Sequence, residues 1–201
     1  MASEADGPVG RRVPLLDTAR AEELAADEGI PDYLAGLSIF RILLNNPGAA
    51  AAVNGMLHRL LWKGSLDARL RELIIMRIAW TRASVYEWTQ HWSVAQGLGV
   101  AEADLLAVRD GASSERFGPL ERAVLMATDE TLVDGRISEA TWTECAGHLG
   151  PGELVELVVV IGNWNMVAQL LLSLDVPLED GVEPWPPDSR MPTTEGGTGD
   201  G

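Results

Sequence analysis

A glutamate and a histidine four residues apart, Glu87 and His91, are the residues of this chain best placed to carry chemistry. On one helix this spacing puts both side chains on the same face, where they can touch. A carboxylate beside an imidazole fixes the orientation and tautomer of the ring, and such a pair can move protons near neutral pH. Tyr86, Trp88 and Trp92 surround the pair with aromatic bulk. The segment therefore indicates acid–base chemistry, although a Glu–His pair on a solvated helix surface would have the same spacing.

Two consecutive helices must position this pair. Residues 69–82 and 85–98 carry apolar side chains at helical spacing, with a short break between the two runs. In an antiparallel hairpin of these helices, Glu72 on the first can reach the face of the second that carries His91. Glu72 can thus reach the pocket of Glu87 and His91, and the resemblance described below implies that these three residues share it, with His91 as the proton carrier and Glu87 or Glu72 as the carboxylate that orients or relays the proton.

The rest of the chain also predicts helices, because no segment alternates between apolar and polar residues with a period of two. Further helices are expected over residues 17–28, 31–44, 48–62, 101–109, 119–133, 138–148 and 152–173. The expected fold is all-α, a compact domain of about eight helices built around the antiparallel hairpin and covering residues 11–182. Residues 1–10 and 183–201 are polar or rich in Pro and Gly, so we expect flexible ends there.

Composition excludes several kinds of partner. A formal net charge of -15 argues against nucleic acid and anionic membranes, which both need clustered Lys and Arg. The longest apolar stretch, residues 154–174, contains Glu156, Asn163 and Asn165, which would be costly in lipid. It is therefore expected to be a helix of the core or of a subunit interface. We expect a cytoplasmic protein that binds a small molecule, with neither nucleic acid nor membrane as a partner.

A resemblance to a known superfamily rests on the frame around the glutamates. Eleven residues separate Glu72 from Ser84, and Glu87 and His91 follow at three and seven residues from Ser84. With Tyr-Glu-Trp-x-x-His after Arg-Glu-Leu, residues 30–175 resemble the carboxymuconolactone decarboxylase and alkyl-hydroperoxidase-D-like superfamily. The redox branch of that superfamily carries Cys-x-x-Cys at the positions of Ser84 and Glu87, so this chain looks like the cysteine-free branch. The resemblance implies an AhpD-like helical protomer in a closed homo-oligomer, commonly a trimer or a hexamer.

The cysteine content excludes dithiol chemistry. Reduction of a hydroperoxide by a dithiol needs a thiolate nucleophile and a resolving thiol. The chain has one cysteine, Cys145, which lies far from the motif, and the Ser84 hydroxyl cannot take the place of a thiol. A thiol peroxidase of this kind is therefore disfavoured.

The resemblance implies a non-redox acid–base enzyme of the decarboxylase, lyase or isomerase type. Its substrate would be a small unsaturated acid or ketone, cyclic or derived from an aromatic compound. The alternative is a catalytically silent protein on the same fold, which binds a ligand or acts in an assembly. Replacing His91 separates the two hypotheses, because only an enzyme has turnover to lose.

Further side chains near the motif are candidates for substrate binding. Tryptophans can wall an apolar ligand, and an arginine can hold a carboxylate with two parallel hydrogen bonds. The candidates are Ser84, Tyr86, Trp88, Trp80, Arg77 and Arg82. Each arginine has an alternative role on a helix surface or at an interface. No spacing of ligands indicates a metal site, and we expect no cofactor.

Overall fold

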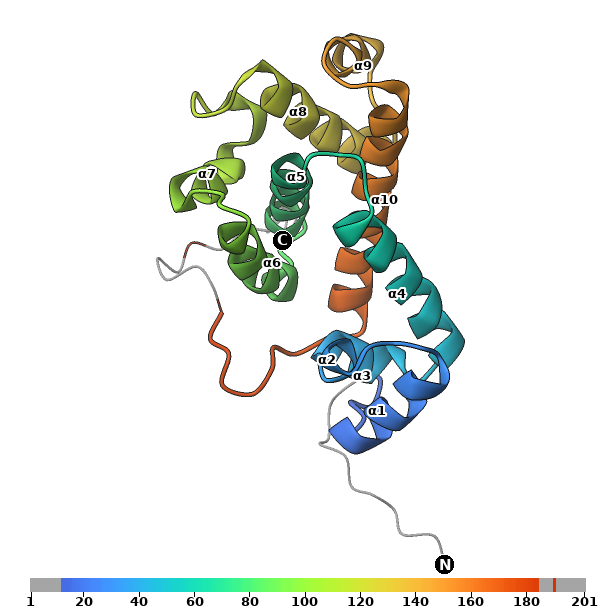
Figure 1. The fold of residues 1–201 in the computed structure, drawn as a ribbon. Helices are drawn as coiled ribbons and strands as arrows, with labels where there is room; N and C mark the ends of the chain where they lie inside the picture. The colour runs from blue at the N-terminus through green and yellow to red at the C-terminus, as the bar shows by residue number, and fades with distance from the viewer. Residues whose placement is uncertain (1–11, 185–189, 191–201) are drawn as a thin grey trace, which may run out of the picture. The chain divides into compact units, whose positions relative to one another are not determined.

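The computed structural model describes residues 12–184 and residue 190, and within them the protein is all-α (Figure 1). The described residues contain ten α-helices, one 3₁₀ helix and no strand. The elements are α1 (Thr18–Asp27), α2 (Asp32–Ala35), α3 (Ser38–Leu43), α4 (Pro47–Trp62), α5 (Ala68–Thr81), α6 (Val85–Gly97), α7 (Glu102–Ala107), η1 (Val108–Ser113), α8 (Pro119–Asp134), α9 (Glu139–Ala146) and α10 (Pro151–Ser173). The predicted fold class is confirmed.

Two of the expected helices are divided. The run 31–44 forms α2 and α3, because the chain leaves the helical conformation at Leu37, which has an extended backbone with φ -72° and ψ 140°. The run 101–109 forms α7 and continues as η1, in which Gly111 bends the backbone with a φ of 58°. The ends predicted to be flexible lie almost entirely outside the described residues.

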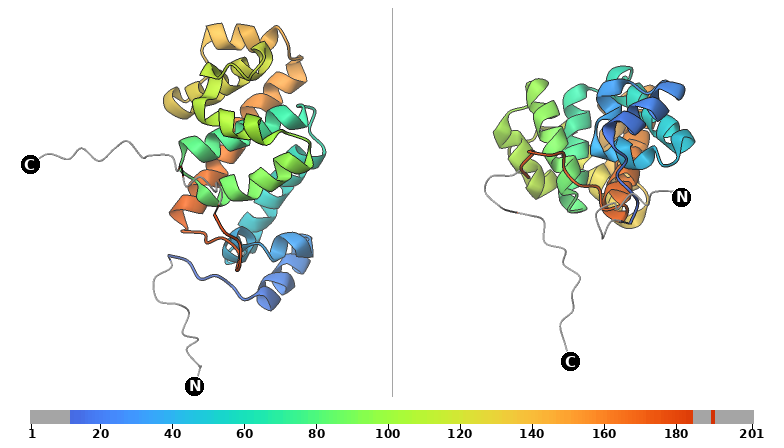
Figure 2. Two further views of the ribbon diagram at one scale, coloured as in Figure 1. Left: turned by 90° about the vertical axis from the view of Figure 1, so that its left-hand side faces the viewer. Right: turned by 90° about the horizontal axis from the view of Figure 1, so that it is seen from below.

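The chain divides into two compact units. The described residues of the first unit are 12–59 and Leu170–Glu183. In this unit α1, α2 and α3 pack on one another. The described residues of the second unit are Leu60–Gln169, Pro184 and Arg190. In it α5 packs against α6, α8 and η1, and Figure 2 shows α5 and α6 side by side from another direction. A single domain over 11–182 stays a prediction.

Helix α5 is the central element of the second unit. Its N-cap Asp67 accepts hydrogen bonds from the backbone N–H groups of Arg69 and Leu70. Apolar side chains occupy nearly every face of the helix and are buried: Leu70, Leu73, Ile74, Ile75, Met76, Ile78 and Ala79. A helix that is apolar all round belongs in the interior. This burial explains why α5 can hold ionisable side chains away from water.

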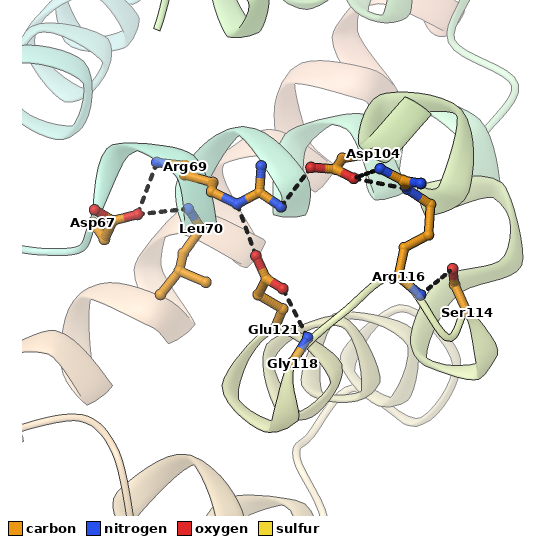
Figure 3. Close-up of polar contacts among 8 residues, drawn as sticks. All are labelled: Asp67, Arg69, Leu70, Asp104, Ser114, Arg116, Gly118 and Glu121. Carbon is orange, nitrogen blue, oxygen red and sulfur yellow. Dashed lines mark hydrogen bonds and ion pairs between the residues drawn. The ribbon is translucent and has the colours of Figure 1, made fainter. Parts of the chain in front are cut away.

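An ion-pair network ties the start of α5 to α7 and α8 (Figure 3). Arg69 contacts Asp104 at 2.9 Å and Glu121 at 2.7 Å, and Arg116 contacts Asp104 at 2.7 Å. Glu121 also accepts a hydrogen bond from the backbone N–H of Gly118. Burial alone would raise the pKa of Asp104, but the two arginines outweigh it and hold that pKa below its usual value. The network orients the helices around the hairpin.

Helix α10 is the only described helix that is long and apolar enough to cross a membrane, by length and composition alone. The mean hydropathy of its most apolar window is 1.6, and half of that window is buried inside the protein. Leu157, Val160, Ile161 and Trp164 are fully buried on one side of it. This is the burial of a core helix, in agreement with the sequence, and the cytoplasmic location stays a prediction.

Gly111 is a position where a side chain cannot be accommodated. Its φ of 58° and ψ of -140° suit glycine, and an added Cβ would lie 2.9 Å from Cζ of Arg77 and 3.1 Å from Oδ2 of Asp129. We expect Gly111→Ala to lower the free energy of unfolding by about 2–3 kcal/mol, through backbone strain and displacement of the Arg77–Asp129 ion pair. Urea denaturation followed by circular dichroism measures this change.

The matched control is Gly97→Ala, at the end of α6. A Cβ added there meets nothing within 4 Å, so the free energy of unfolding should change by less than about 1 kcal/mol. If Gly111→Ala and Gly97→Ala lowered the free energy of unfolding equally, neither crowding nor backbone strain at Gly111 would explain the loss.

Candidate acid–base site

A left-handed turn joins α5 to α6 and sets the geometry of the site. Ala83 has a φ of 57°, which costs a residue with a Cβ on the order of 1 kcal/mol. The backbone N–H of Ser84 donates to the carbonyl of Ala79 at 2.9 Å, which closes the end of α5. Ser84 is then the N-cap of α6, and α6 returns antiparallel to α5. The predicted hairpin is present.

The hairpin brings Glu72 and His91 together. Oε2 of Glu72 lies 2.8 Å from Nδ1 of His91. Glu72 is fully buried, and Nε of Arg71 donates to its other oxygen, Oε1, at 3.1 Å. Arg71 is itself buried, so its charge compensates the charge of the Glu72 carboxylate without solvent. Sequence reasoning missed Arg71, and the only signal for it is its position next to Glu72.

Trp164 of α10 completes the arrangement. Its Nε1–H donates to Nε2 of His91 at 3.2 Å, and the two rings meet edge to face. An indole N–H can only donate, so Nε2 of His91 accepts, and the imidazole proton of the neutral ring lies on Nδ1 and points to Glu72. Arg71, Glu72, His91 and Trp164 thus form one hydrogen-bonded chain, which we call the His91 network. The His91 side chain retains 16% exposure.

Glu87 occupies a different environment from Glu72. It is 2% exposed, and neither of its carboxyl oxygens has a hydrogen-bond partner. Burial raises the pKa of Glu87 well above its usual value, and the neighbouring Ser84 side chain offsets only part of that rise. Burial therefore favours the neutral form of the Glu87 carboxyl. The carboxylate that orients His91 is Glu72, on the other helix, although the spacing along α6 suggested Glu87 as well.

The aromatic candidates lie mainly in the hydrophobic core. The ring centroids of Trp80 and Trp88 are 5.4 Å apart, and those of Trp88 and Trp92 are 5.9 Å apart. The Arg109 guanidinium lies 4.8 Å from the Trp80 ring, a cation–π distance. Tyr86 and Trp88 are buried. These side chains pack the hairpin, and a role in binding substrate stays a prediction for them.

The two candidate arginines have protein partners. Nε and NH2 of Arg77 donate to the two carboxylate oxygens of Asp129, at 2.7 and 3.0 Å. Nε of Arg82 donates to Oδ1 of Asn165 at 2.9 Å, and its NH2 donates to the carbonyl of Leu132 at 3.1 Å. The structure joins neither arginine to the His91 network, so we do not include them in the proposed site.

A hollow of about 410 Å³ lies elsewhere in the second unit. It is lined by residues of η1, α8 and α9: Ala112, Pro119, Arg122, Ala123, Met126, Ala140, Thr141 and Glu144. None of these belongs to the His91 network. Among the described residues, no group of three or more His, Cys, Asp or Glu side chains could hold a metal ion.

The sequence and the fold both match known proteins. Residues 47–130, which include the α5–α6 hairpin, match the Carboxymuconolactone decarboxylase family. No protein of curated function matches the sequence. An alkylhydroperoxidase AhpD core protein from Ralstonia eutropha JMP134, peroxidase-related and uncharacterised, has a similar structure with a TM-score of 0.69 and 15% identity, over 85% of this chain and 93% of that one.

Two further structures share the fold. The debrominase Bmp8 in complex with 2,3,4-tribromopyrrole has a TM-score of 0.69 and 16% identity, over 86% of this chain and 94% of that one. A peroxidase-related protein from Silicibacter sp. TM1040 has a TM-score of 0.68 and 14% identity, over 90% and 97% of the two chains. Identities this low establish the fold alone. The match of residues 47–130 bears out the resemblance to the carboxymuconolactone decarboxylase family over that part of the chain, and the solved structures bear out the AhpD-like fold.

Proposed function

We propose that this chain, whose residues 47–130 match the Carboxymuconolactone decarboxylase family and whose fold is AhpD-like, is a non-redox acid–base enzyme of the decarboxylase, lyase or isomerase type. Its substrate is a small unsaturated acid or ketone, cyclic or derived from an aromatic compound. The debrominase of the same fold, whose structure contains a tribrominated pyrrole, supports a small unsaturated ring as a ligand for such a scaffold. The absence of a Cys-x-x-Cys pair sets this chain apart from dithiol peroxidases.

The observation that carries the proposal is the contrast between the two buried glutamates. Arg71 compensates the charge of Glu72, whereas Glu87 has no hydrogen-bond partner for either oxygen. Two carboxyl groups whose environments differ in this way are suited to opposite roles in proton transfer. Glu87 is the proposed acid, which protonates the carbon or oxygen on which negative charge develops. His91, oriented by Glu72, is the proposed proton acceptor.

His91 can act as a base only if Nε2 exchanges the Trp164 hydrogen bond for one to substrate. The distance of 3.2 Å between these nitrogens is at the long end of the range, so this exchange costs little. Cys145 takes no part. Burial first, and then the charges of Glu130 and Glu144, raise the pKa of its thiol, which therefore does not supply a thiolate.

We predict that Glu87→Gln and His91→Ala each reduce turnover by a factor on the order of 10²–10⁴, because each removes one proton-transfer group. The assay follows loss of 4-carboxymuconolactone and release of carbon dioxide, with related unsaturated acids in parallel. Glu102→Gln, which changes an exposed carboxylate on α7, is the matched control and should retain full turnover. Turnover that survives both substitutions would contradict the assignment.

One observation favours the alternative, a catalytically silent protein that binds a ligand or acts in an assembly. Both ring nitrogens of His91 are engaged within the protein, and the described hollow lies away from the network. The same experiment separates the two functions. A silent protein would show no turnover with any of these acids, in the wild type or in either variant.

We also propose that the protein is a cytoplasmic homo-oligomer, a trimer or a hexamer. Apolar side chains on α10 remain exposed in the described protomer, with Val155 at 65%, Val158 at 44% and Met166 at 39%. Burying such a stripe against other copies removes it from water. Light scattering during size exclusion should give a multiple of the 21.6 kDa protomer mass, and Val158→Glu should reduce that mass. A monomeric wild type would contradict the proposal.

A further inference from the structure

The first turn of α6 lacks the cap that its sequence suggests. Ser84 and Glu87 stand at the N-cap and at the third helical position, the spacing of a capping box. In a capping box the glutamate accepts the N–H of the N-cap residue. That N–H instead donates to the carbonyl of Ala79, and the Ser84 side chain makes no capping hydrogen bond. Because of the left-handed turn at Ala83, the Ser84 N–H that would donate to Glu87 in a capping box donates to Ala79.

As a result, polar atoms are buried there without partners. Ser84 is 1% exposed and Glu87 is 2% exposed, and neither Oγ of the former nor either carboxyl oxygen of the latter has a hydrogen bond of good geometry, although the Ser84 hydroxyl is near enough to lower the pKa of the Glu87 carboxyl in part. Nε1 of Trp88, the residue that follows Glu87, is also buried and without a partner. Each such group costs free energy unless something else satisfies it. Unsatisfied polar atoms on three residues at the start of α6 point to a ligand that binds there.

The chemistry of these groups selects an anion. The N-terminus of a helix of 13 residues presents backbone N–H groups and positive potential. The Ser84 hydroxyl and the Trp88 indole supply hydrogen-bond donors, and so does the Glu87 carboxyl in the neutral form that its burial favours. The buried guanidinium of Arg71 pairs with Glu72 on α5, and that of Arg109 lies over the Trp88 ring, 5.6 Å from its centroid. The donors that the first turn of α6 itself supplies are neutral.

We propose that the start of α6 is an oxyanion-binding site, in which the Ser84 hydroxyl and the Glu87 carboxyl hold the carboxylate of a small organic acid. This assignment rests on the proposed function, since it states which part of the substrate lies beside Glu87. The same donors face the oxygen on which negative charge accumulates when a carboxylated or carbonyl-bearing ring reacts. In this proposal the Ser84 hydroxyl orients the ligand, a role for which no thiol is needed.

Binding of acetate, a minimal carboxylate, tests the site without any turnover. Titration followed by the amide NMR signals of α6 should show wild-type binding that Ser84→Ala and Glu87→Ala each weaken by about five- to tenfold, the loss expected for one hydrogen bond to a charged group. Glu87→Gln keeps an N–H donor and should stay within about threefold of the wild type. Ser93→Ala, an exposed serine on the same helix, is the matched control and should change nothing.

The pH dependence provides a second readout. Because Glu87 binds the anion as a neutral acid, acetate affinity in the wild type should fall as pH rises through its raised pKa, whereas the affinity of Glu87→Gln should not follow that titration. Circular dichroism of each variant establishes that it is folded. Unaltered acetate binding in folded Ser84→Ala and Glu87→Ala, or no binding by the wild type, overturns the site and leaves bound water as the partner of these atoms.

The two proposals can fail separately. Acetate binding that depends on Ser84 and Glu87, with no turnover of any unsaturated acid, supports the anion site and overturns the enzymatic function. Turnover that depends on His91 and Glu87, without acetate binding at α6, retains the enzyme and overturns the anion site.

Discussion

Replacing Glu72 with alanine is expected to lower the free energy of unfolding by about 3–5 kcal/mol, because it leaves a buried charge without its partner. Arg71 is 6% exposed and would lose the carboxylate that Nε and NH2 contact. Nδ1 of His91 would lose its partner at the same time. Urea denaturation, with the slope of the transition checked for two-state behaviour, measures the loss.

The control for this prediction removes both charges together. Arg71→Met with Glu72→Leu replaces the ion pair by apolar side chains of similar size, and such replacements of buried pairs are often close to neutral. The double variant should therefore be more stable than Glu72→Ala, with the remaining deficit coming from His91. If it were equally unstable, the cost would lie in packing around α5, and the uncompensated charge would not be its cause.

The second large effect is expected at Trp164, which is fully buried on α10. Trp164→Ala should lower the free energy of unfolding by about 3–5 kcal/mol, mainly through the cavity that it leaves. Trp164→Phe keeps most of the bulk and removes the N–H that donates to Nε2 of His91. Its cost should be smaller, on the order of 1–2 kcal/mol.

Nitrogen-15 NMR of the imidazole separates packing from hydrogen bonding in these variants. In the wild type, the neutral ring should carry its proton on Nδ1, because Nε2 accepts from Trp164. In Trp164→Phe, the proton on Nδ1 should persist through Glu72, while the Nε2 signal moves toward that of a nitrogen exposed to water. An unchanged Nε2 signal would contradict the Trp164 hydrogen bond.

Much of the fold could be predicted from the chain because the relevant signals are local. Apolar residues at helical spacing and breaks at Gly and Pro identify α1, α4, α5, α6 and α10 closely. The frame of Glu72, Ser84, Glu87 and His91 identifies the superfamily and excludes dithiol chemistry, since residue type and spacing are enough for both. The sequence prediction runs one helix through the break at Leu37, which separates α2 from α3, although Gly36 stands immediately before it as the C-cap of α2.

The candidate site was only partly predictable, since its decisive contacts join segments far apart in the chain. Trp164 lies 73 residues beyond His91, and only packing of α10 against the hairpin makes it the donor that places the imidazole proton on Nδ1. Spacing along α6 favoured Glu87 as the neighbour of His91, yet the hairpin pairs His91 with Glu72.

Tertiary structure likewise decided the burial and the hydrogen bonding of the Glu87 carboxyl. The Ser-x-x-Glu pattern by itself indicates an ordinary capping box, in which the carboxylate would be paired. The turn at Ala83 gives the Ser84 N–H to Ala79, and burial then leaves the Glu87 carboxyl without a partner. The sequence determined which ionisable groups are present and how they are spaced. Packing decided which of them is compensated by a charge and in which of them burial favours the neutral form, because desolvation depends on neighbours that spacing along one helix does not specify.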